Sequence, residues 1–326
     1  MNTNPPSAQP RFSPRRELGR TGFHATQLGI GDLADRNVPL EQCVATARRA
    51  LDAGLNLIDT APSYENGYSE EIVGRAVRET LAARGGRTDA RKQLFLIDKV
   101  DHHDQPVRPQ VEGSLQRLGL PFTDLFVLHG LSTVEGWHRA AATGGALDQL
   151  DACIQADQTR FKGISSHSPD VLLLALVSGR CNVVMFPVGP FVEPRFIQDV
   201  LPQAKARGVG TVCFKTFGAG KLLGDTAGYN QPLQERPRGK FSSGGTTPGA
   251  PVLPHLSVRE CLHYTLTCDP DVALLGMSFP NEQDAAFAAA QDFVPLSAEQ
   301  RNDIRHRAIA ARADKGPCWW NPDPQA

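Results

Sequence analysis

The sequence predicts an α/β protein in which eight parallel strands close into a (β/α)8 TIM barrel. Two observations predict this fold. Short apolar runs alternate with segments of helical periodicity along most of the chain, and these runs number eight. Buried apolar runs between helices are typical of a parallel sheet. Eight such units favour a closed barrel, and a chain of 326 residues is long enough to build one.

Each expected element follows from its local pattern. Gly54 is a C-cap signal after the first helix, and Ser69 followed by two acids is an N-cap signal. We expect strands at 27–31, 55–59, 94–97, 124–128, 161–165, 182–186, 208–214 and 272–275. We expect helices at 40–53, 69–83, 107–118, 169–178, 194–207, 257–267, 281–291 and 297–312.

An open dinucleotide-binding sheet is the alternative fold for such a pattern. That fold needs Gly-x-Gly-x-x-Gly after its first strand. Residues 28–32 read Leu-Gly-Ile-Gly-Asp and supply only the first two glycines. The barrel is therefore the better prediction.

Composition narrows the class of protein. The formal net charge of -1 gives no overall field that would favour nucleic acid or an anionic membrane. There is no signal-peptide pattern and no apolar stretch of roughly 18 residues, so we expect a cytoplasmic protein. Seven cysteines, an odd number without a Cys-x-x-Cys pair, are read as small buried hydrophobic residues. We expect no metal site.

The domain organisation predicted is simple. Residues 1–14 are polar and rich in proline, so we expect them to be disordered. Residues 15–326 are expected to form a single barrel domain. Residues 215–256 are rich in Gly, Pro and Ser and follow the strand 208–214, so we expect a functional or mobile loop on the catalytic face.

Polar residues at the ends of three consecutive strands carry the chemistry. Asp59 ends one strand and is followed by Tyr64, Lys99 follows the next, and His129 the one after. In a barrel such residues meet at one mouth. Tyr64 can give a proton to a carbonyl oxygen, because a neighbouring ammonium lowers the pKa of a phenol. Asp59 can hold Lys99, and His129 can orient the carbonyl.

These residues and their flanks resemble the aldo-keto reductase family. Residues 59–70, Asp-Thr-Ala-Pro-Ser-Tyr-Glu-Asn-Gly-Tyr-Ser-Glu, resemble its signature around the catalytic aspartate and tyrosine. Residues 18–22 resemble its opening hairpin, 113–119 its third helix and 162–166 its fifth strand. The resemblance covers roughly residues 15–292. It implies an oxidoreductase that uses a nicotinamide cofactor to reduce an aldehyde, ketone or sugar carbonyl reversibly.

The resemblance also implies roles for individual residues. Tyr64 would be the general acid, tuned by Lys99 and Asp59, with His129 orienting the carbonyl. The cofactor would be held at the nicotinamide amide, the pyrophosphate and the adenosine. The residues implied are Ser165, Ser166, Met185, Lys215, Thr216, Phe217, Gly218, Gly220, Leu222, Gly276, Met277, Ser278 and Gln283.

Some positions depart from the family pattern. Ser166 and Met185 stand where relatives often carry Asn and Gln, which implies a weaker or rearranged grip on the nicotinamide amide. Residues 276–283 contain neither Lys nor Arg, the usual holders of a 2′-phosphate. We expect NADP as cofactor, with NAD as a rival. Asp98 is also unusual, and could lie near the ammonium of Lys99 or face away.

Three further features of the sequence could have a functional role or a purely structural one. Asp101, His102, His103 and Asp104 are expected to form a solvated loop, which could line the substrate entrance, rather than a metal site. His167 could touch the cofactor or substrate. The pair Trp319–Trp320 could pack the tail onto the barrel or line the substrate pocket.

A non-enzymatic redox sensor or regulatory subunit that binds the same cofactor is the alternative function, because the fold alone does not exclude it. The partner expected for an enzyme is a small carbonyl or alcohol. We expect no nucleic-acid or membrane partner.

Overall fold

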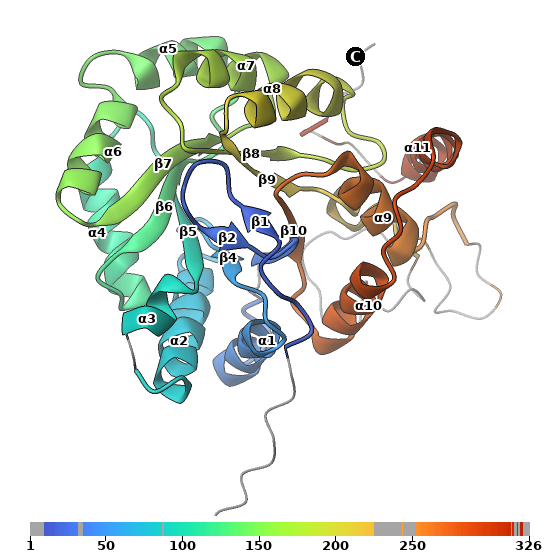
Figure 1. The fold of residues 1–326 in the computed structure, drawn as a ribbon, viewed down its shortest axis with the longest axis horizontal. Helices are drawn as coiled ribbons and strands as arrows, with labels where there is room; N and C mark the ends of the chain where they lie inside the picture. The colour runs from blue at the N-terminus through green and yellow to red at the C-terminus, as the bar shows by residue number, and fades with distance from the viewer. Residues whose placement is uncertain are drawn as a thin grey trace, which may run out of the picture.

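A computed structural model describes residues 10–31, 35–86, 88–224, 243, 249, 252–313, 315, 318 and 320–321. Eight parallel strands close into a barrel in the order β10-β3-β4-β5-β6-β7-β8-β9, which confirms the predicted fold class. The strands are β3 (Leu28–Gly31), β4 (Leu57–Asp59), β5 (Phe95–Val100), β6 (Thr123–Leu128), β7 (Thr159–Ser165), β8 (Val183–Pro187), β9 (Gly210–Phe214) and β10 (Val272–Gly276). Figure 1 shows the helices arranged as a ring around these strands.

The helices connect the strands on the outside of the barrel. They are α1 (Leu40–Asp52), α2 (Tyr68–Ala83), α3 (Thr88–Lys92), α4 (Val107–Leu118), α5 (Val134–Ala141), α6 (Ala146–Gln155), α7 (Pro169–Ser178), α8 (Leu201–Ala206), α9 (Val258–Cys268), α10 (Pro280–Gln291) and α11 (Ala298–Arg312). Two short turns of other helix types, η1 (Phe196–Val200) and η2 (Gly218–Gly220), precede α8 and follow β9.

The strand register brings the polar strand ends to one rim. Asp59 pairs with Ile97 of β5, and Lys99 lies two residues beyond Ile97 on the same face of the strand. Val100 pairs with Leu128, so the residue that follows Leu128 stands at the end of β6 beside them. The parallel arrangement therefore places these side chains at the C-terminal mouth of the barrel.

Two layers of apolar side chains form the core. The barrel interior is filled by Leu57, Phe95, Ile97, Leu125, Val127, Val183, Met185, Val212, Val272 and Leu274. The hairpin of β1 (Arg16–Glu17) and β2 (His24–Ala25) lies across the middle of the barrel in Figure 1. Its Phe23 ring meets the Phe95 ring at 5.0 Å, so the hairpin seals the N-terminal end of the barrel.

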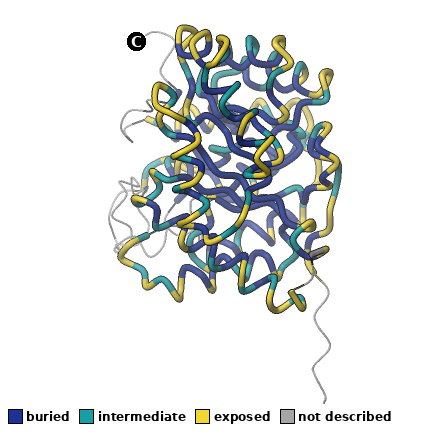
Figure 2. Tube along the Cα trace, turned by 90° about the vertical axis from the view of Figure 1, so that its left-hand side faces the viewer, coloured by how far each residue is buried: buried dark blue, intermediate teal, exposed yellow. Residues whose placement is uncertain are grey.

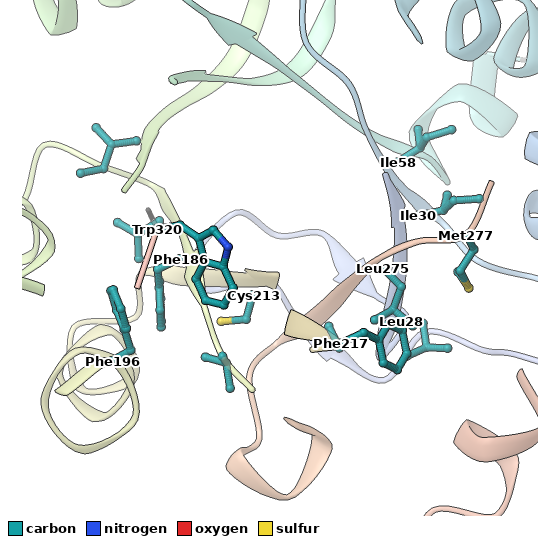
Figure 3. Packing of buried hydrophobic residues seen from close by; sticks show 14 of the residues in the cluster. Leu28, Ile30, Ile58, Phe186, Phe196, Cys213, Phe217, Leu275, Met277 and Trp320 are labelled. Atoms are coloured by element: carbon teal, nitrogen blue, oxygen red, sulfur yellow. The ribbon is translucent and has the colours of Figure 1, made fainter. Parts of the chain in front are cut away.

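A second and larger layer lies between the strands and the helices. Figure 2 shows buried chain in the middle of the molecule and exposed chain at its periphery. Figure 3 shows part of this layer, in which Phe186 of β8 stacks on Phe196 of η1 at 6.1 Å between ring centroids. Six of the seven cysteines are buried and Cys268 is partly buried, as their apolar flanks predict.

Several predicted elements differ from those observed. The helices α3, α5 and α6 were not predicted, because each is short and α5 and α6 are divided by Gly144–Gly145. The helix expected over 194–207 begins as the π-type turn η1, because Pro202 has no N–H to donate to the carbonyl of residue 198.

The start of α2 also differs. Gly67, in the left-handed region at φ 83°, occupies the N-cap instead of Ser69. Ser69 lies inside the helix and is buried, and its Oγ accepts a hydrogen bond from Thr60 Oγ1 at 2.8 Å. Its hydroxyl is therefore used to fix the segment after β4 and not to cap the helix.

Part of the N-terminal segment packs against the barrel. Phe12 is buried, its N–H donates to the carbonyl of Ala53 at 3.0 Å, and its ring meets Phe287 at 5.1 Å. The expectation of disorder over 1–14 is therefore wrong for the part around Phe12, because an aromatic ring inside this polar segment finds an apolar partner on α10. Residues 1–9 lie outside the described residues. Among the described helices, none combines the length and apolarity that a membrane span requires.

A close crossing of α2 and α4 provides a test of this packing. A Cβ at Gly74 would lie 2.0 Å from the carbonyl oxygen of Leu118. Gly74→Ala should therefore lower the free energy of unfolding by about 1–3 kcal/mol, although alanine is the better helix former. Urea denaturation followed by circular dichroism measures the change.

Gly113→Ala is the matched control. Gly113 lies in α4, and a Cβ there would meet only the flexible end of Arg117 at 3.3 Å. It should be neutral or stabilise by up to about 1 kcal/mol. Equal destabilisation by both substitutions would contradict the proposed close crossing.

Candidate active site

A buried ion pair lies at the centre of the barrel mouth. Lys99 Nζ donates to both carboxylate oxygens of Asp59 at 2.7 Å and to the carbonyl of Thr60 at 2.6 Å. The side chains of Lys99 and Asp59 are 2% and 3% exposed. Three acceptors therefore fix the ammonium in one place.

Tyr64 lies directly against this ion pair. Its ring centroid is 4.5 Å from Lys99 Nζ. A tight turn holds it there: Tyr64 N donates to the carbonyl of Ala61, and the next residues, Glu65 and Asn66, have positive φ. The chain can thus reverse from β4 into α2 and present the phenol at the mouth.

Electrostatics keeps Lys99 charged. Burial alone opposes the ammonium form, but the Asp59 carboxylate and the Tyr64 phenol outweigh it and raise the pKa of Lys99 above its ordinary value. A permanent positive charge beside a phenol stabilises the phenolate that remains after proton donation. The pair therefore suits Tyr64 to act as a proton donor.

His129 completes the group of four predicted catalytic side chains. Its ring centroid lies 5.6 Å from that of Tyr64, at 81° between the ring planes. Its Nδ1 lies 2.5 Å from Oδ1 of Asp101. The structure therefore brings Asp59, Tyr64, Lys99 and His129 together at one mouth.

The contact of Asp101 with His129 was not predicted from the sequence. Asp101 was placed in a solvated loop, yet its side chain is only 15% exposed and also accepts from Ser63 N at 2.9 Å. The sequence held a signal, because Asp101 lies two residues after Lys99 and a strand repeats its faces every two residues. Among the described residues, no cluster of three or more His, Cys, Asp or Glu side chains has the arrangement of a metal site.

Asp98 faces away from the mouth. It pairs in register with Phe126 of the outer layer, whereas Lys99 pairs with Val127 of the barrel interior. Burial and then the Glu70 carboxylate raise the pKa of Asp98 well above its ordinary value. Asp98 therefore lies behind the site, and its side chain is not a second partner of the Lys99 ammonium.

The predicted nicotinamide contacts lie next to this group. Ser165, at the end of β7, accepts from Gly130 N at 2.8 Å, and Ser166 N donates to the carbonyl of Met185. Ser166 is fully buried, and its Oγ accepts from Ser168 N at 3.1 Å. Met185 fills the barrel interior, so this predicted contact position presents an apolar side chain.

The segment after β9, predicted to lie along the diphosphate of the cofactor, is a glycine-containing turn. Gly218 and Gly220 have positive φ, and a Cβ at Gly218 would lie 2.4 Å from the ring of Phe191. Thr216 is buried, and its Oγ1 makes no hydrogen bond with any described residue. Lys215 supplies a cation over the rings of Phe214 and Trp320. Phe217 and Leu222 are buried in the outer layer of the core.

Phe214 is a second residue that the sequence reasoning did not single out. It ends β9, is partly exposed at the mouth, and its ring lies 5.3 Å from that of His167. Burial, then Lys215 and His129, lower the pKa of His167 to about 4, so its imidazole is neutral at physiological pH. A flat apolar ring and a neutral imidazole therefore border the four polar side chains.

The residues predicted to lie near an adenosine have different surroundings. Gly276 is exposed at the end of β10, and Ser278 N donates to Glu282 at 2.8 Å. Met277 is fully buried in the outer core (Figure 3). Gln283 is turned into α1, where its Nε2 donates to the carbonyl of Thr46 at 2.8 Å. The side chain of Gln283 is therefore engaged in helix packing.

The tail and the loop after β9 are joined beside the mouth. Lys315 is fully buried and donates to the carbonyl of Lys221 at 2.8 Å, to Ser243 Oγ at 2.6 Å and to the carbonyl of Pro254 at 2.8 Å. Trp320 is buried, with its ring 5.3 Å from Phe191. The described tail thus packs onto the barrel, while Trp319 and most of 225–251 lie outside the described residues.

A closed barrel with this polar set at its C-terminal mouth defines a TIM-barrel oxidoreductase. The model of the aldo/keto reductase family matches residues 25–306, and the chain belongs to that family. The chain is therefore an NAD(P)-dependent aldo-keto reductase.

Curated relatives agree with this assignment, and a solved structure has a similar fold. The chain is similar to L-galactose dehydrogenase of Arabidopsis thaliana, at 26% identity over 90% of this chain and 93% of the relative. It is similar to NADH-specific methylglyoxal reductase of Escherichia coli, at 26% identity over 64% and 66%. Its fold is similar to the holo form of an aldo-keto reductase from Bacillus halodurans, with TM-score 0.65, 24% identity, and coverage of 92% and 97%.

The ion pair gives a prediction for stability. Asp59→Asn leaves a buried ammonium without its anionic partner, so the free energy of unfolding should fall by about 3–5 kcal/mol. The double variant Asp59→Asn/Lys99→Met removes both charges and should be more stable than Asp59→Asn alone. Denaturant unfolding of the three proteins measures the effect, and a double variant less stable than the single one would contradict it.

The contribution of the Lys99–Asp59 pair to the free energy of unfolding should not change with pH near neutrality. The raised pKa of Lys99 means that its contribution to stability is complete below the unfolded value of about 10.4 and is lost only as pH rises through the higher folded value. The stability difference between the native protein and the double variant Asp59→Asn/Lys99→Met, which has neither charge, should therefore be constant from about pH 6 to pH 9. A steady decline across that interval would show that Lys99 already loses its proton there.

Proposed function

We propose that this protein reduces an aldehyde, ketone or sugar carbonyl to the alcohol, reversibly, with Tyr64 as the proton donor. The observation that supports this most is the contact between Tyr64 and the buried Lys99–Asp59 pair, with Lys99 Nζ 4.5 Å from the phenol ring centroid. A carbonyl oxygen gains negative charge as hydride reaches its carbon, and a preorganised proton donor stabilises that charge.

Each of the four side chains has a role in this proposal. Tyr64 gives its proton to the carbonyl oxygen. Lys99 stabilises the phenolate that remains, and Asp59 keeps Lys99 charged and in place. His129 borders the ring of Tyr64 and orients the carbonyl oxygen.

The chain offers groups that fit a nicotinamide cofactor. A reduced nicotinamide supplies the hydride. We assign its amide to Ser165 and Ser166, beside the apolar Met185. The buried hydroxyl of Thr216, which has no hydrogen-bond partner among the described residues, and the ammonium of Lys215 suit a diphosphate.

Two further parts of the chain complete the proposed cofactor site. The backbone of Gly218 and Gly220 allows close approach of a diphosphate. Phe217 and Leu222, which are buried in the outer layer of the core, would hold the segment after β9 against the barrel. We assign binding of the adenosine to Gly276, Met277 and Ser278. Gln283 would support this site indirectly, because its side chain holds α10 against α1.

The preferred cofactor is proposed to be NADP. No Lys or Arg lies in 276–283, but the fold brings Arg49 of α1 to that segment, where it donates to the carbonyl of Pro280 at 3.1 Å and to Asp284 at 2.5 Å. Arg49 also lines a surface hollow with Ala45, Arg48 and Asp52. A guanidinium suits a 2′-phosphate. Asp284 already pairs with Arg49, and its carboxylate would repel a 2′-phosphate. NAD, which has no 2′-phosphate, therefore stays the alternative cofactor.

The substrate class is proposed from the chemistry and the relatives. Names of similar proteins include an L-galactose dehydrogenase and a methylglyoxal reductase, whose substrates are small and oxygen-rich. Small carbonyl compounds and the corresponding alcohols are therefore the first substrates to test. We propose that the barrel over residues 15–326 acts as one catalytic domain.

Replacement of the proton donor tests this function. Tyr64→Phe should retain binding of the reduced nicotinamide and lose about 10²–10⁴-fold in kcat for carbonyl reduction, because a positioned general acid contributes about that much. NADPH oxidation followed by absorbance, with a panel of aldehydes and ketones that includes methylglyoxal, measures kcat.

Tyr68→Phe is the matched control, because Tyr68 Oη donates to the carbonyl of Val38 at 3.0 Å and takes no part in the proposed chemistry. Its kcat should stay within about threefold of the native value. Full activity of Tyr64→Phe would show that Tyr64 is not the proton donor. Cofactor binding without turnover of any carbonyl by the native protein would favour a redox sensor.

Cofactor preference has its own test. Quenching of tryptophan fluorescence by NADPH and NADH gives two dissociation constants, with Trp137, Trp319 and Trp320 as the source of signal. NADPH should bind more tightly. Arg49→Gln should weaken the binding of NADPH by roughly tenfold or more, since a charge-assisted hydrogen bond contributes about 1.5–3 kcal/mol. The dissociation constant of NADH should stay unchanged.

Arg108→Gln is the control, because Arg108 of α4 pairs with Glu112 and does not line that hollow. It should change neither dissociation constant. Tighter binding of NADH by the native protein would overturn the NADP assignment and leave the reductase assignment in place.

A further inference from the structure

We propose that Asp101 is a positioning residue that fixes a proton on Nδ1 of His129 and so decides what the other ring nitrogen can do toward a substrate. The part that concerns the substrate rests on the proposed function. The part that concerns the ring proton rests on the geometry alone.

The hydrogen bond defines the donor. Asp101 Oδ1 lies 2.5 Å from His129 Nδ1, and an ionised carboxylate can only accept. Nδ1 must therefore carry the proton. Nε2 of His129 makes no hydrogen bond with any described residue, and the side chain is 25% exposed. Nε2 is thus the nitrogen left for a ligand at the mouth.

The carboxylate is itself held in place. Ser63 N donates to Asp101 Oδ2 at 2.9 Å, and Ser63 Oγ donates to Oδ1 at 3.2 Å. Ser63 immediately precedes Tyr64 in the turn after β4. Asp101 therefore ties the orientation of His129 to the same turn that presents the phenol.

Asp101 stays ionised over the working range of pH. Burial alone would favour its neutral form, but the hydrogen bonds from His129 and Ser63 outweigh burial and lower the pKa of Asp101 below its ordinary value. Its contribution to stability is present above the unfolded value of about 3.9 and is lost as pH falls through the lower folded value. At neutral pH the carboxylate is therefore an acceptor only.

The other charged and titratable groups around the pair come from several elements. They are Tyr64 and Lys99 at the mouth, His103 beside the backbone of His129, His167 after β7, and Arg117 on α4. Among the described residues, Asp101 is the carboxylate hydrogen-bonded to the His129 ring. It is therefore the group that selects the ring tautomer.

This tautomer has a chemical consequence. With the proton on Nδ1, a neutral His129 can accept a hydrogen bond at Nε2 but cannot donate one. It suits an alcohol, whose O–H donates to it. A carbonyl oxygen needs a donor, so His129 orients a carbonyl only when both ring nitrogens are protonated, with the cation paired to Asp101.

Asp101→Asn should reverse the tautomer. Ser63 N–H needs an acceptor, so the amide oxygen of the asparagine would face Ser63 and its NH₂ would face Nδ1. Nδ1 then becomes the acceptor, and the proton of the neutral ring moves to Nε2. The variant ring can therefore donate to a carbonyl without a positive charge.

Long-range ¹⁵N–¹H NMR of the full-length ¹⁵N-labelled protein measures the tautomer without substrate or cofactor. His129→Gln identifies the signals of His129. We expect a protonated Nδ1 in the native protein and in Asp104→Asn, a control because Asp104 is exposed, and a protonated Nε2 in Asp101→Asn. A native ring protonated on Nε2 alone, or unchanged signals in Asp101→Asn, would overturn the proposal.

The pH profile of turnover separates positioning from a purely structural role. The pH profiles of kcat/KM for carbonyl reduction should coincide in shape for the native protein and Asp104→Asn, and should differ in shape for Asp101→Asn. The difference is expected because the native ring donates from Nε2 only when both nitrogens are protonated, whereas the neutral ring of Asp101→Asn also donates from Nε2. Identical profile shapes for the native protein and Asp101→Asn would overturn the proposal. Absence of turnover in the native protein would instead refute the proposed function and leave the NMR result to decide the tautomer.

Discussion

The buried ion pair between Lys99 and Asp59 is the interaction on which the site depends. Two charges with almost no exposure to solvent are tolerated only when each is well paired, and Lys99 has three acceptors within 2.7 Å. The pair fixes a positive charge at a known point in the mouth. Tyr64, and through it His129, are arranged around that charge.

The barrel supplies the geometry that this pair needs. Asp59 and Lys99 come from adjacent parallel strands, whose register is set by interior side chains such as Leu57 and Ile97. A slip of one residue would turn Lys99 into the outer layer and bring Asp98 into the mouth. The apolar core therefore positions the chemistry as directly as the polar contacts do.

Much of the fold could be predicted from the sequence, because each strand is a short apolar run with clear limits. Three catalytic candidates could be predicted because Asp59 ends such a run, and Lys99 and His129 come within two residues of the end of one. The hydrogen bond of Asp101 could not, since it depends on the exact path of the chain beyond β5. Gln283 was assigned to the cofactor from the family resemblance, and its contact with Thr46 appears only once α1 and α10 are packed.

The central claim is that this mouth transfers hydride from a nicotinamide to a carbonyl carbon. Mass spectrometry of products formed with NADPH or NADH that carries deuterium at both C4 positions, [4,4-²H₂], and small carbonyl compounds tests it most directly. The account predicts an alcohol that carries one deuterium on the former carbonyl carbon. Oxidation of neither cofactor, or an alcohol without deuterium at that carbon, would contradict it.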